Sequence, residues 1–209
     1  MLRRGADDLW LIKKQNAHTM KTQFIHFSKT LICIGIIATA LLSCKSKGES
    51  AGASSGVKKP DIDIHTAVVS GNLEAVKQHL QAGTNINEQD PFGGSSPLIS
   101  AAVFDKPQIA QVLIDAGADL NFQNKDGSTA LHTAAFFCRP GIVKMLLDKG
   151  ADKTIRNKYG ATPYESVAIP FADVKEAYDM MGQMLSPMGL KLDYAYIEKT
   201  RPEIAAMLK

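Results

Sequence analysis

Apolar residues in the middle of the chain recur at the spacing of short, paired helices. In the stretch 127–150, GSTALHTAAFFCRPGIVKMLLDKG, one helix face is formed by Leu131, Ala134 and Ala135. A second face with the same spacing follows at Ile142, Val143, Leu146 and Leu147. Pro140 suits the first turn of the second helix, and Gly150 suits its end because glycine tolerates a left-handed backbone. The pattern predicts a helix, a tight turn and a second helix.

The same pattern returns at a regular interval along the chain. The glycines that precede the helix pairs, Gly94, Gly127 and Gly160, are evenly spaced. Glycines that end the second helices keep almost the same spacing, at Gly83, Gly117 and Gly150. A period of this length predicts an all-α solenoid, in which each helix pair buries the face of its neighbour. The expected repeats span residues 61–93, 94–126, 127–159 and 160–209.

The third unit resembles an ankyrin repeat. It contains Ser-Thr-Ala-Leu-His-Thr-Ala-Ala at 128–135, followed by Leu-Leu-Asp-Lys-Gly-Ala-Asp at 146–152. The resemblance covers roughly residues 61–168 and part of the tail. It implies a domain that binds another protein and carries out no chemistry, without a cofactor. It also implies that His65 and His132 are structural, bonding to nearby backbone.

The fourth unit departs from the pattern. Arg-Pro-Glu-Ile-Ala-Ala-Met-Leu-Lys at 201–209 repeats Arg-Pro-Gly-Ile-Val-Lys-Met-Leu-Leu at 139–147, but almost two periods later instead of one. The excess over one period predicts an inserted segment, near 169–200. An unrelated helical cap at the end of the chain is the alternative. The helical segments expected in this last unit are 162–168, 171–185, 193–199 and 202–208.

The beginning of the chain carries a single apolar run, 31–42, LICIGIIATALL, which follows Lys21 and Lys29. The run is shorter than the roughly 20 residues that cross a bilayer, and it matches the apolar part of an export signal. The sequence Leu-Leu-Ser-Cys that ends at Cys44 resembles the lipobox of bacterial lipoproteins. That resemblance implies cleavage before Cys44, followed by acylation of its thiol and its amine. An ordinary signal or a short anchor with a chance cysteine is the alternative.

These features divide the first sixty positions into three segments. Residues 1–19 lack apolar periodicity and are interpreted as an upstream start-site artefact or a cytoplasmic extension. Residues 20–43 form the expected lipoprotein signal peptide, and 44–60 form a Gly/Ser/Lys tether with almost nothing to bury. Lys45, which follows the lipidated cysteine, favours the outer membrane by resemblance to enterobacterial sorting rules. We therefore expect the domain in the periplasm or at the cell surface.

Charge and cysteine content narrow the function. The formal net charge is +3, of which residues 1–43 carry +4 and the remainder −1. A nearly neutral domain gives no electrostatic reason to expect nucleic acid. Cys33 would leave with the signal and Cys44 would carry lipid, so Cys138 would be the remaining thiol, and no internal disulfide is expected.

Candidate chemistry is sparse. His65 and His132 occupy the same slot two repeats apart, roughly 16–20 Å, so they cannot share a metal ion. His79 is expected to face solvent, and Cys138 is interpreted as structural or incidental. Asp105 and Cys138 stand where the family prefers glycine, so each turn is expected to be reshaped or strained. Four methionines suit either core packing or a copper site: Met180, Met181, Met184 and Met188.

The candidate binding surface follows the ends of the first helices, on the concave face that the family uses. Stacking would place Val69, Val103 and Phe136 in a row, with Phe104 and Phe137 beside it. The row predicts either an apolar groove for a partner or a surface that the insertion covers. Loop fingers would rim it at residues 90–92, 124–126 and 157–159. The finger residues expected to contact the partner are Asn124, Lys125 and Tyr159, with Tyr159 as the main hot spot.

These observations favour a lipid-anchored ankyrin domain of the bacterial envelope that binds another protein and is not an enzyme. A toxin-immunity or inhibitor protein is the alternative within the binding class. An enzyme or a copper-handling protein, with its site in the insertion, is the alternative from other classes. A pocket lined by Asp173, Glu176 and Asp193 would favour the enzyme.

Overall fold

The computed structural model describes residues 58–209. The expected start-site artefact at 1–19, the signal peptide at 20–43, the lipidated Cys44 and most of the tether at 44–60 lie outside the described residues. Within 58–209, no helix combines the length and the apolar character that a bilayer crossing would need.

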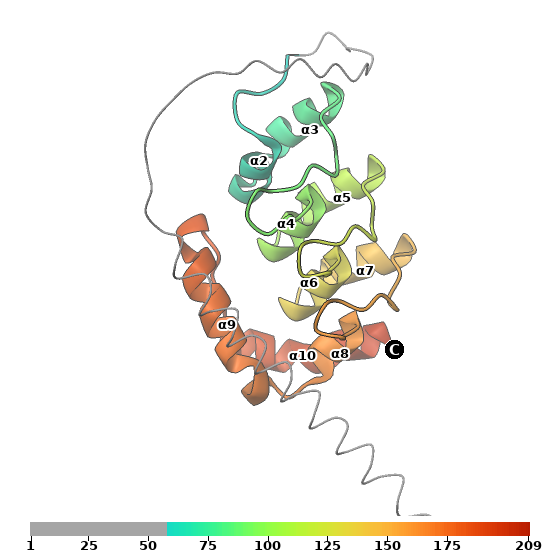
Figure 1. Cartoon of the computed structure of the whole chain (residues 1–209), viewed down its shortest axis with the longest axis vertical. Helices are drawn as coiled ribbons and strands as arrows, with labels where there is room; N and C mark the ends of the chain where they lie inside the picture. Colours follow the sequence, from blue (N-terminus) through green and yellow to red (C-terminus); the bar gives the residue numbers. More distant parts are fainter. Residues whose placement is uncertain (1–57) are drawn as a thin grey trace, which may run out of the picture. The chain divides into compact units, whose positions relative to one another are not determined.

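The described residues form helices and no strand, and six of the helices stack as three successive pairs (Figure 1). In each pair a seven-residue helix is followed by a nine-residue helix after a short turn. The all-α solenoid predicted from the repeat period is therefore confirmed. The pairs are α2 (Ile64–Ser70) with α3 (Leu73–Gln81), α4 (Pro97–Val103) with α5 (Pro107–Asp115), and α6 (Ala130–Phe136) with α7 (Pro140–Asp148).

Local sequence explains where the first helices begin. A short polar side chain precedes each of them and accepts a hydrogen bond from a backbone N–H of the first turn. Asp63 caps α2, Ser96 caps α4 and Thr129 caps α6. Proline at the first position of α4, α5 and α7 costs no hydrogen bond there. Each pair therefore starts at a position that its own sequence specifies.

The turn inside each pair has a left-handed backbone. Gly71 takes a φ of 76° in the first pair, while Asp105 takes 51° and Cys138 takes 54° in the next two. The turns of the second and third pairs are thus not reshaped by the prolines that follow them. The two non-glycine residues keep the conformation that glycine would adopt without steric cost.

One apolar core runs through the stack. Its members belong to both helices of each pair, and side chains such as Leu98, Leu113, Leu131 and Leu146 have no exposed surface. The core continues to Ile204 and Leu208 near the end of the chain. Each helix pair therefore buries the face of the next, as nearest-neighbour stacking requires.

The last segment of the chain adds α8 (Pro163–Ala168), α9 (Phe171–Leu185), the short helix η2 (Ser186–Met188) and α10 (Tyr194–Leu208). The helix expected at 171–185 is α9 itself. The final turns of α10 contact α7 and α8, which are the neighbours that the second helix of a split fourth repeat would have. The exact division into four repeats stays a prediction.

One expectation for this region is wrong. The sequence predicted a turn at 193–199 and a separate helix at 202–208, but α10 runs through Pro202 without a break. Asp193 caps the helix by accepting a hydrogen bond from the N–H of Tyr196. Ile197 and Ile204 are buried on either side of the proline. Packing on both sides outweighs the one backbone hydrogen bond that proline removes.

Two further expectations are corrected by burial. His79 is fully buried rather than solvent-facing; its Nε2 donates to the carbonyl of Ile62 at 2.8 Å, and its Nδ1 lies 3.1 Å from the hydroxyl of Thr84. It shares the apolar face of α3, because it lies one helical turn after Ala75. Core packing is also wrong for Met184 and Met188, whose exposed fractions are 57% and 46%.

Candidate functional site

The ends of the first helices bring three apolar side chains to equivalent places in successive pairs. We call Val69, Val103 and Phe136 the inner row; each is half-buried. Phe104, which follows Val103, is also half-buried, so it stays available at the surface. Phe137 is 4% exposed, so its expected role in contacting a partner is wrong. In the third pair, the two residues after the Ala-Ala pair thus point to different environments, one inward and one toward the surface.

The insertion covers one end of the inner row. The ring of Tyr178 in α9 stacks on Phe136 with centroids 4.4 Å apart and an interplanar angle of 16°. The hydroxyl of Tyr178 donates to the carbonyl of Phe136. Val69 and Val103 keep part of their surface exposed. The covering predicted as one alternative therefore applies to Phe136.

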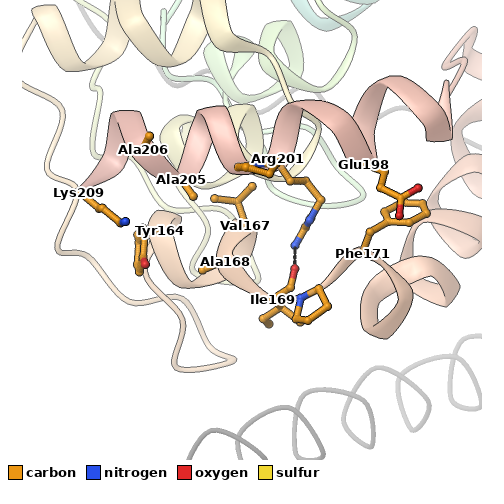
Figure 2. A pocket seen from close by; sticks show the side chains of 12 residues that line it. Tyr164, Val167, Ala168, Ile169, Phe171, Glu198, Arg201, Ala205, Ala206 and Lys209 are labelled. Atoms are coloured by element: carbon orange, nitrogen blue, oxygen red, sulfur yellow. Dashed lines mark hydrogen bonds between the residues drawn. The ribbon is translucent and has the colours of Figure 1, made fainter.

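A buried arginine fixes Tyr178 in this position. Arg201 is 3% exposed and donates to the hydroxyl of Tyr178 at 2.8 Å. It also donates to the carbonyl of Ile169 at 2.6 Å (Figure 2). A longer bond, of 3.3 Å, reaches the carbonyl of Ser166. Burial raises the pKa of Tyr178, against the opposing effect of the guanidinium. The tyrosine therefore stays protonated and keeps its hydrogen to donate.

A hollow of about 380 Å³ lies beside this arginine, between α8 and α10 (Figure 2). Its lining is largely apolar and includes Tyr164, Val167 and Ala205. The three carboxylates that would favour an enzyme do not line it, and Asp193 serves as a helix cap. Across residues 58–209, no three His, Cys, Asp or Glu side chains come together in a way that could hold a metal ion.

The first finger holds an exposed aromatic ring on a tightly bonded loop. One oxygen of the Asp90 carboxylate accepts from the N–H groups of Phe92 and Gly93, and the other accepts from Ser95. Burial opposes ionisation of Asp90, but these three donors hold its pKa below the usual value. Phe92 at the tip is 87% exposed. The finger therefore presents this ring from a pre-organised backbone.

Phe92 is the finger residue that sequence reasoning undervalued. The sequence predicts that the segment 90–92 rims the surface, but it favours Tyr159 as the hot spot. Tyr159 is half-buried, and burial together with Asp126 raises its pKa to about 12. The signal was present in the glycine spacing, since Gly83 and Gly117 are one position further apart than Gly117 and Gly150. The additional residue lengthens the first finger.

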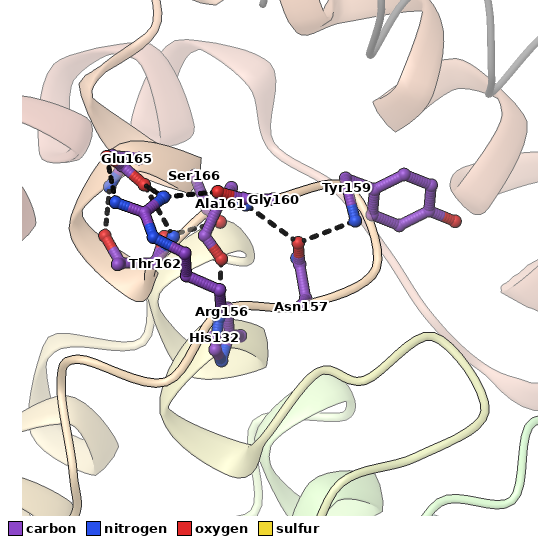
Figure 3. Close-up of polar contacts among 9 residues, drawn as sticks. All are labelled: His132, Arg156, Asn157, Tyr159, Gly160, Ala161, Thr162, Glu165 and Ser166. Carbon is purple, nitrogen blue, oxygen red and sulfur yellow. Dashed lines mark hydrogen bonds and ion pairs between the residues drawn. The ribbon is translucent and has the colours of Figure 1, made fainter.

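Asn124 and Lys125 have structural contacts in these loops. The Asn124 side-chain oxygen accepts from the N–H groups of Asp126 and Ser128. Asn157 has the same role in the next repeat, accepting from Tyr159 and Ala161 (Figure 3). The ammonium of Lys125 donates to the carbonyl of Phe92 at 2.9 Å and so supports the first finger. Whether these residues also contact a partner stays a prediction.

The two histidines that were expected to be structural, one in the first helix pair and one in the third, each bond to a loop that comes later in the chain. His132 is 2% exposed, and its Nε2 donates to the carbonyl of Ala161 at 3.0 Å (Figure 3). Its Nδ1 faces the hydroxyl of Thr129 at 2.9 Å. Burial lowers the pKa of His132, although its backbone contacts oppose the shift. The Nε2 of His65 donates to the carbonyl of Glu88 at 3.1 Å.

The third finger ends in a bidentate ion pair. Arg156 contacts both carboxylate oxygens of Glu165, at 2.6 and 3.0 Å (Figure 3). Glu165 in turn accepts from the N–H of Thr162, which completes a capping box at the start of α8. The finger is therefore joined to the next helix by charge and by capping, although both charged side chains are exposed and the pair adds little stability.

The remaining thiol has the surroundings of a structural cysteine. Cys138 has no exposed surface, and its Sγ lies 3.6 Å from the carbonyl of Ile197. Burial raises its pKa to about 11, although Arg201 and Arg139 oppose the shift. A thiol with this pKa stays protonated near neutral pH and is a poor nucleophile.

Stacked helix pairs joined by bonded loops define a helical repeat protein, and the comparisons identify the type of repeat. The family described as ankyrin repeats (three copies) matches residues 64–157, so this chain contains ankyrin repeats, which typically mediate binding between proteins. Human protein phosphatase 1 regulatory subunit 27 is 44% identical over 64 residues, which cover 31% of this chain and 41% of that protein. Human 2-5A-dependent ribonuclease is 33% identical over 82 residues, which cover 38% of this chain and 11% of that protein.

A solved structure of the ankyrin repeat domain of Bcl-3 is also similar, with 34% identity and a TM-score of 0.48. The similarity covers 49% of this chain and 45% of that one. This chain spans less than half of the length of the curated relatives it matches.

Proposed function

We propose that this protein is a lipid-anchored module of the bacterial envelope that binds another protein through its ankyrin repeats and catalyses no reaction. The observation that carries the proposal is the inner row. Three stacked repeats place Val69, Val103 and Phe136 at equivalent positions, and each side chain is half-buried. Phe92 adds an exposed ring on the adjoining finger. Such apolar side chains on a rigid frame suit an interface centre.

The anchoring element of the proposal rests on the sequence near Cys44. A short apolar run followed by Leu-Leu-Ser-Cys suits a bacterial lipoprotein signal. The tether that follows would keep the repeats near the lipid head groups, since fifteen flexible residues span about 20 Å on average. Lys45 supports the outer membrane, with the repeats in the periplasm or at the cell surface.

A second candidate within the binding class is an inhibitor or immunity protein. The observation in its favour is the similarity to a protein named as a regulatory subunit of a phosphatase. An inhibitor of this kind would use the same inner row. The two candidates differ in what the partner does, so an assay of the captured partner's activity, with and without this protein, separates them.

The metal-handling alternative has one observation in its favour, the exposed thioethers of Met184 and Met188. Methionine sulfur is a ligand that Cu(I) accepts. Titration with Cu(I) of the natural protein and of a variant with leucine at the four methionines of the insertion tests it. Saturable binding that the variant lacks would support copper handling over protein binding.

The binding function is tested by capture from detergent-solubilised membranes with the full chain as bait. Val69→Glu/Val103→Glu should reduce capture of the specific partner at least ten-fold, because a buried carboxylate is costly in an apolar interface. Gln108→Glu/Gly141→Glu adds the same two charges at exposed positions on the second helices and should capture as much as the natural protein. Equal capture by both variants, with unchanged helical content, would refute the inner row as the binding surface.

A further inference from the structure

The insertion is attached to the repeats more weakly than the repeats are to one another. We call residues 169–193, which comprise α9, η2 and the return to α10, the insertion hairpin. Of the fifteen residues of α9, only Tyr178 is buried, and Pro170 provides no side-chain cap. Six of the seven residues of α6 are buried. A helix with so few buried contacts opens locally at a lower free energy than the core beneath it.

Tyr178 is the buried residue of α9 in this attachment, and Phe171, Val174 and Leu192 of the insertion hairpin pack around its cluster. The Tyr178 ring lies on Phe136, and its hydroxyl donates to the Phe136 carbonyl while accepting from Arg201. Tyr178, Cys138 and Ile197 form a small apolar cluster of their own, separate from the core of the stack. When Tyr178 leaves Phe136, this cluster loses its central member, whereas the core of the repeats keeps all of its contacts.

The attachment falls on the surface that the proposed function assigns to a partner. Phe136 occupies the third place of the inner row, and Val69 and Val103 occupy the first two. The insertion hairpin covers Phe136, and α9 lies on the side of the first helices (Figure 1). A partner that lies along the whole row therefore meets Tyr178 at the third repeat, on the same ring that it would bind.

We propose that the insertion hairpin is an autoinhibitory lid, which covers Phe136 in the free protein and must release it before a partner can occupy the full inner row. The inference rests on the proposed binding function for its purpose, but the lid itself can be tested without a partner. A partner that needs the open form binds with its intrinsic affinity reduced by the open fraction. The hairpin thus sets the affinity without contributing to the interface.

The reactivity of the buried Cys138 thiol can be used to measure opening of the insertion hairpin. In a full chain with Cys33→Ser and Cys44→Ser, Cys138 is the one remaining cysteine. Cys138 packs against Tyr178 of the hairpin and Ile197 of α10, so loss of Tyr178 uncovers one side of the thiol, and we expect a disulfide reagent to reach it from that side. We expect labelling at least ten-fold faster than global unfolding measured under the same conditions. Labelling that is no faster than global unfolding would mean that the hairpin opens only with the whole domain, and would overturn the proposal.

Two variants connect the labelling to Tyr178. Tyr178→Phe keeps the stacked ring but removes the hydrogen bonds to Phe136 and Arg201, so we expect labelling to accelerate about ten-fold. Met184→Ala changes an exposed side chain of the same helix and should leave the rate unchanged. Equal rates for the natural side chain and Tyr178→Phe, or acceleration by Met184→Ala as well, would show that Tyr178 does not hold the lid.

Once a partner has been captured, its affinity for Tyr178→Phe distinguishes an autoinhibitory lid from a hairpin that helps to bind the partner. An autoinhibitory lid predicts that Tyr178→Phe binds the partner several-fold more tightly, because a larger fraction of the protein is open. Unchanged or weaker binding by Tyr178→Phe would contradict autoinhibition. If no partner is captured at all, the proposed function fails, and the labelling rates still report whether the hairpin opens independently.

Discussion

Asp105 and Cys138 show at the level of single residues how a repeat turn tolerates unfavourable side chains. Both have the left-handed backbone that Gly71 adopts in the first pair. Asp105 is compensated by its surroundings, because its carboxylate lies 3.5 Å from the Arg139 guanidinium of the next pair. Cys138 is compensated by complete burial against Ile197. The stack supplies contacts that outweigh the local strain.

Asp105 provides a matched test of that strain. Asp105→Ala and Asp105→Asn both remove the charge that faces Arg139, but asparagine tolerates a left-handed backbone much better than alanine. We expect Asp105→Ala to be less stable than Asp105→Asn by about 1 kcal/mol in urea unfolding. If the two variants unfold at the same urea concentration, backbone conformation does not limit stability at this turn.

At this scale, the sequence predicted residues whose role depends on local spacing. The sequence left the Asp105 turn open between a reshaped and a strained backbone, and the structure shows the left-handed conformation. The resemblance to ankyrin repeats implied the structural role of His132, and its contacts with Thr129 and Ala161 agree with that role. The helical spacing also places His79 on the buried face, but its polar side chain led us to expect exposure to solvent. The partners that satisfy the buried imidazole, Ile62 and Thr84, lie outside the helix, so the helical pattern did not reveal them. Phe137 and Phe136 are adjacent and equally apolar, so only the packed structure distinguishes the buried ring from the half-buried one.

The first finger is an element whose shape depends on one carboxylate. Asp90 accepts three backbone N–H groups, and the loop that it closes carries Phe92 at its tip. A charged acceptor is worth more than a neutral one in such a turn. The finger therefore owes its form to a carboxylate that is bonded to the backbone of its own loop.

Removing that acceptor should loosen the finger. Asp90→Ala leaves three N–H groups without their acceptor, and we expect a loss of about 1–3 kcal/mol of stability with faster amide exchange at Phe92 and Gly93. Gln89→Ala alters the exposed neighbour and serves as the control, with little change expected. Unaltered exchange in Asp90→Ala would show that other contacts, such as those of Lys125, suffice to hold the loop.

The sequence predicted some helices and contacts but not others, and the difference has a physical reason. The period and the capping residues are local, so the three helix pairs and α9 could be located from the sequence alone. The continuity of α10 was missed because Pro202 is a local helix breaker, while the burial of Ile197 and Ile204 on either side of it is a property of the assembled stack. The stacking of Tyr178 on Phe136 joins two different repeats, and no repeat spacing specifies that contact.

On the scale of the whole molecule, the chain combines a regular scaffold with one irregular addition. The repeats bury a continuous core, whereas the insertion hairpin shares only the cluster around Tyr178. A solenoid tolerates such an insertion because stability is passed between neighbouring repeats, and a loop that leaves and returns within one repeat does not interrupt it. The addition can therefore acquire a role of its own.

The prediction at the scale of the whole molecule concerns its lipid anchoring through Cys44. Cys44→Ser should abolish metabolic labelling with a fatty-acid analogue and move the protein from the membrane fraction to the soluble fraction, because acyl chains supply about 0.8 kcal/mol per buried methylene. Cys33→Ser, within the expected signal peptide, should leave labelling intact. Labelling that persists in Cys44→Ser would remove the basis for the envelope assignment.

The fingers are joined to one another through main-chain atoms. The N–H of Lys125 donates to the carbonyl of Gly93 at 3.0 Å, and the N–H of Lys158 donates to the carbonyl of Asp126 at 2.9 Å. Because every residue except proline has such an N–H, tip side chains at these positions can be exchanged without undoing the link. Substitutions of these tip side chains, by evolution or by design, could therefore change the binding specificity while the backbone hydrogen bonds between the fingers are kept.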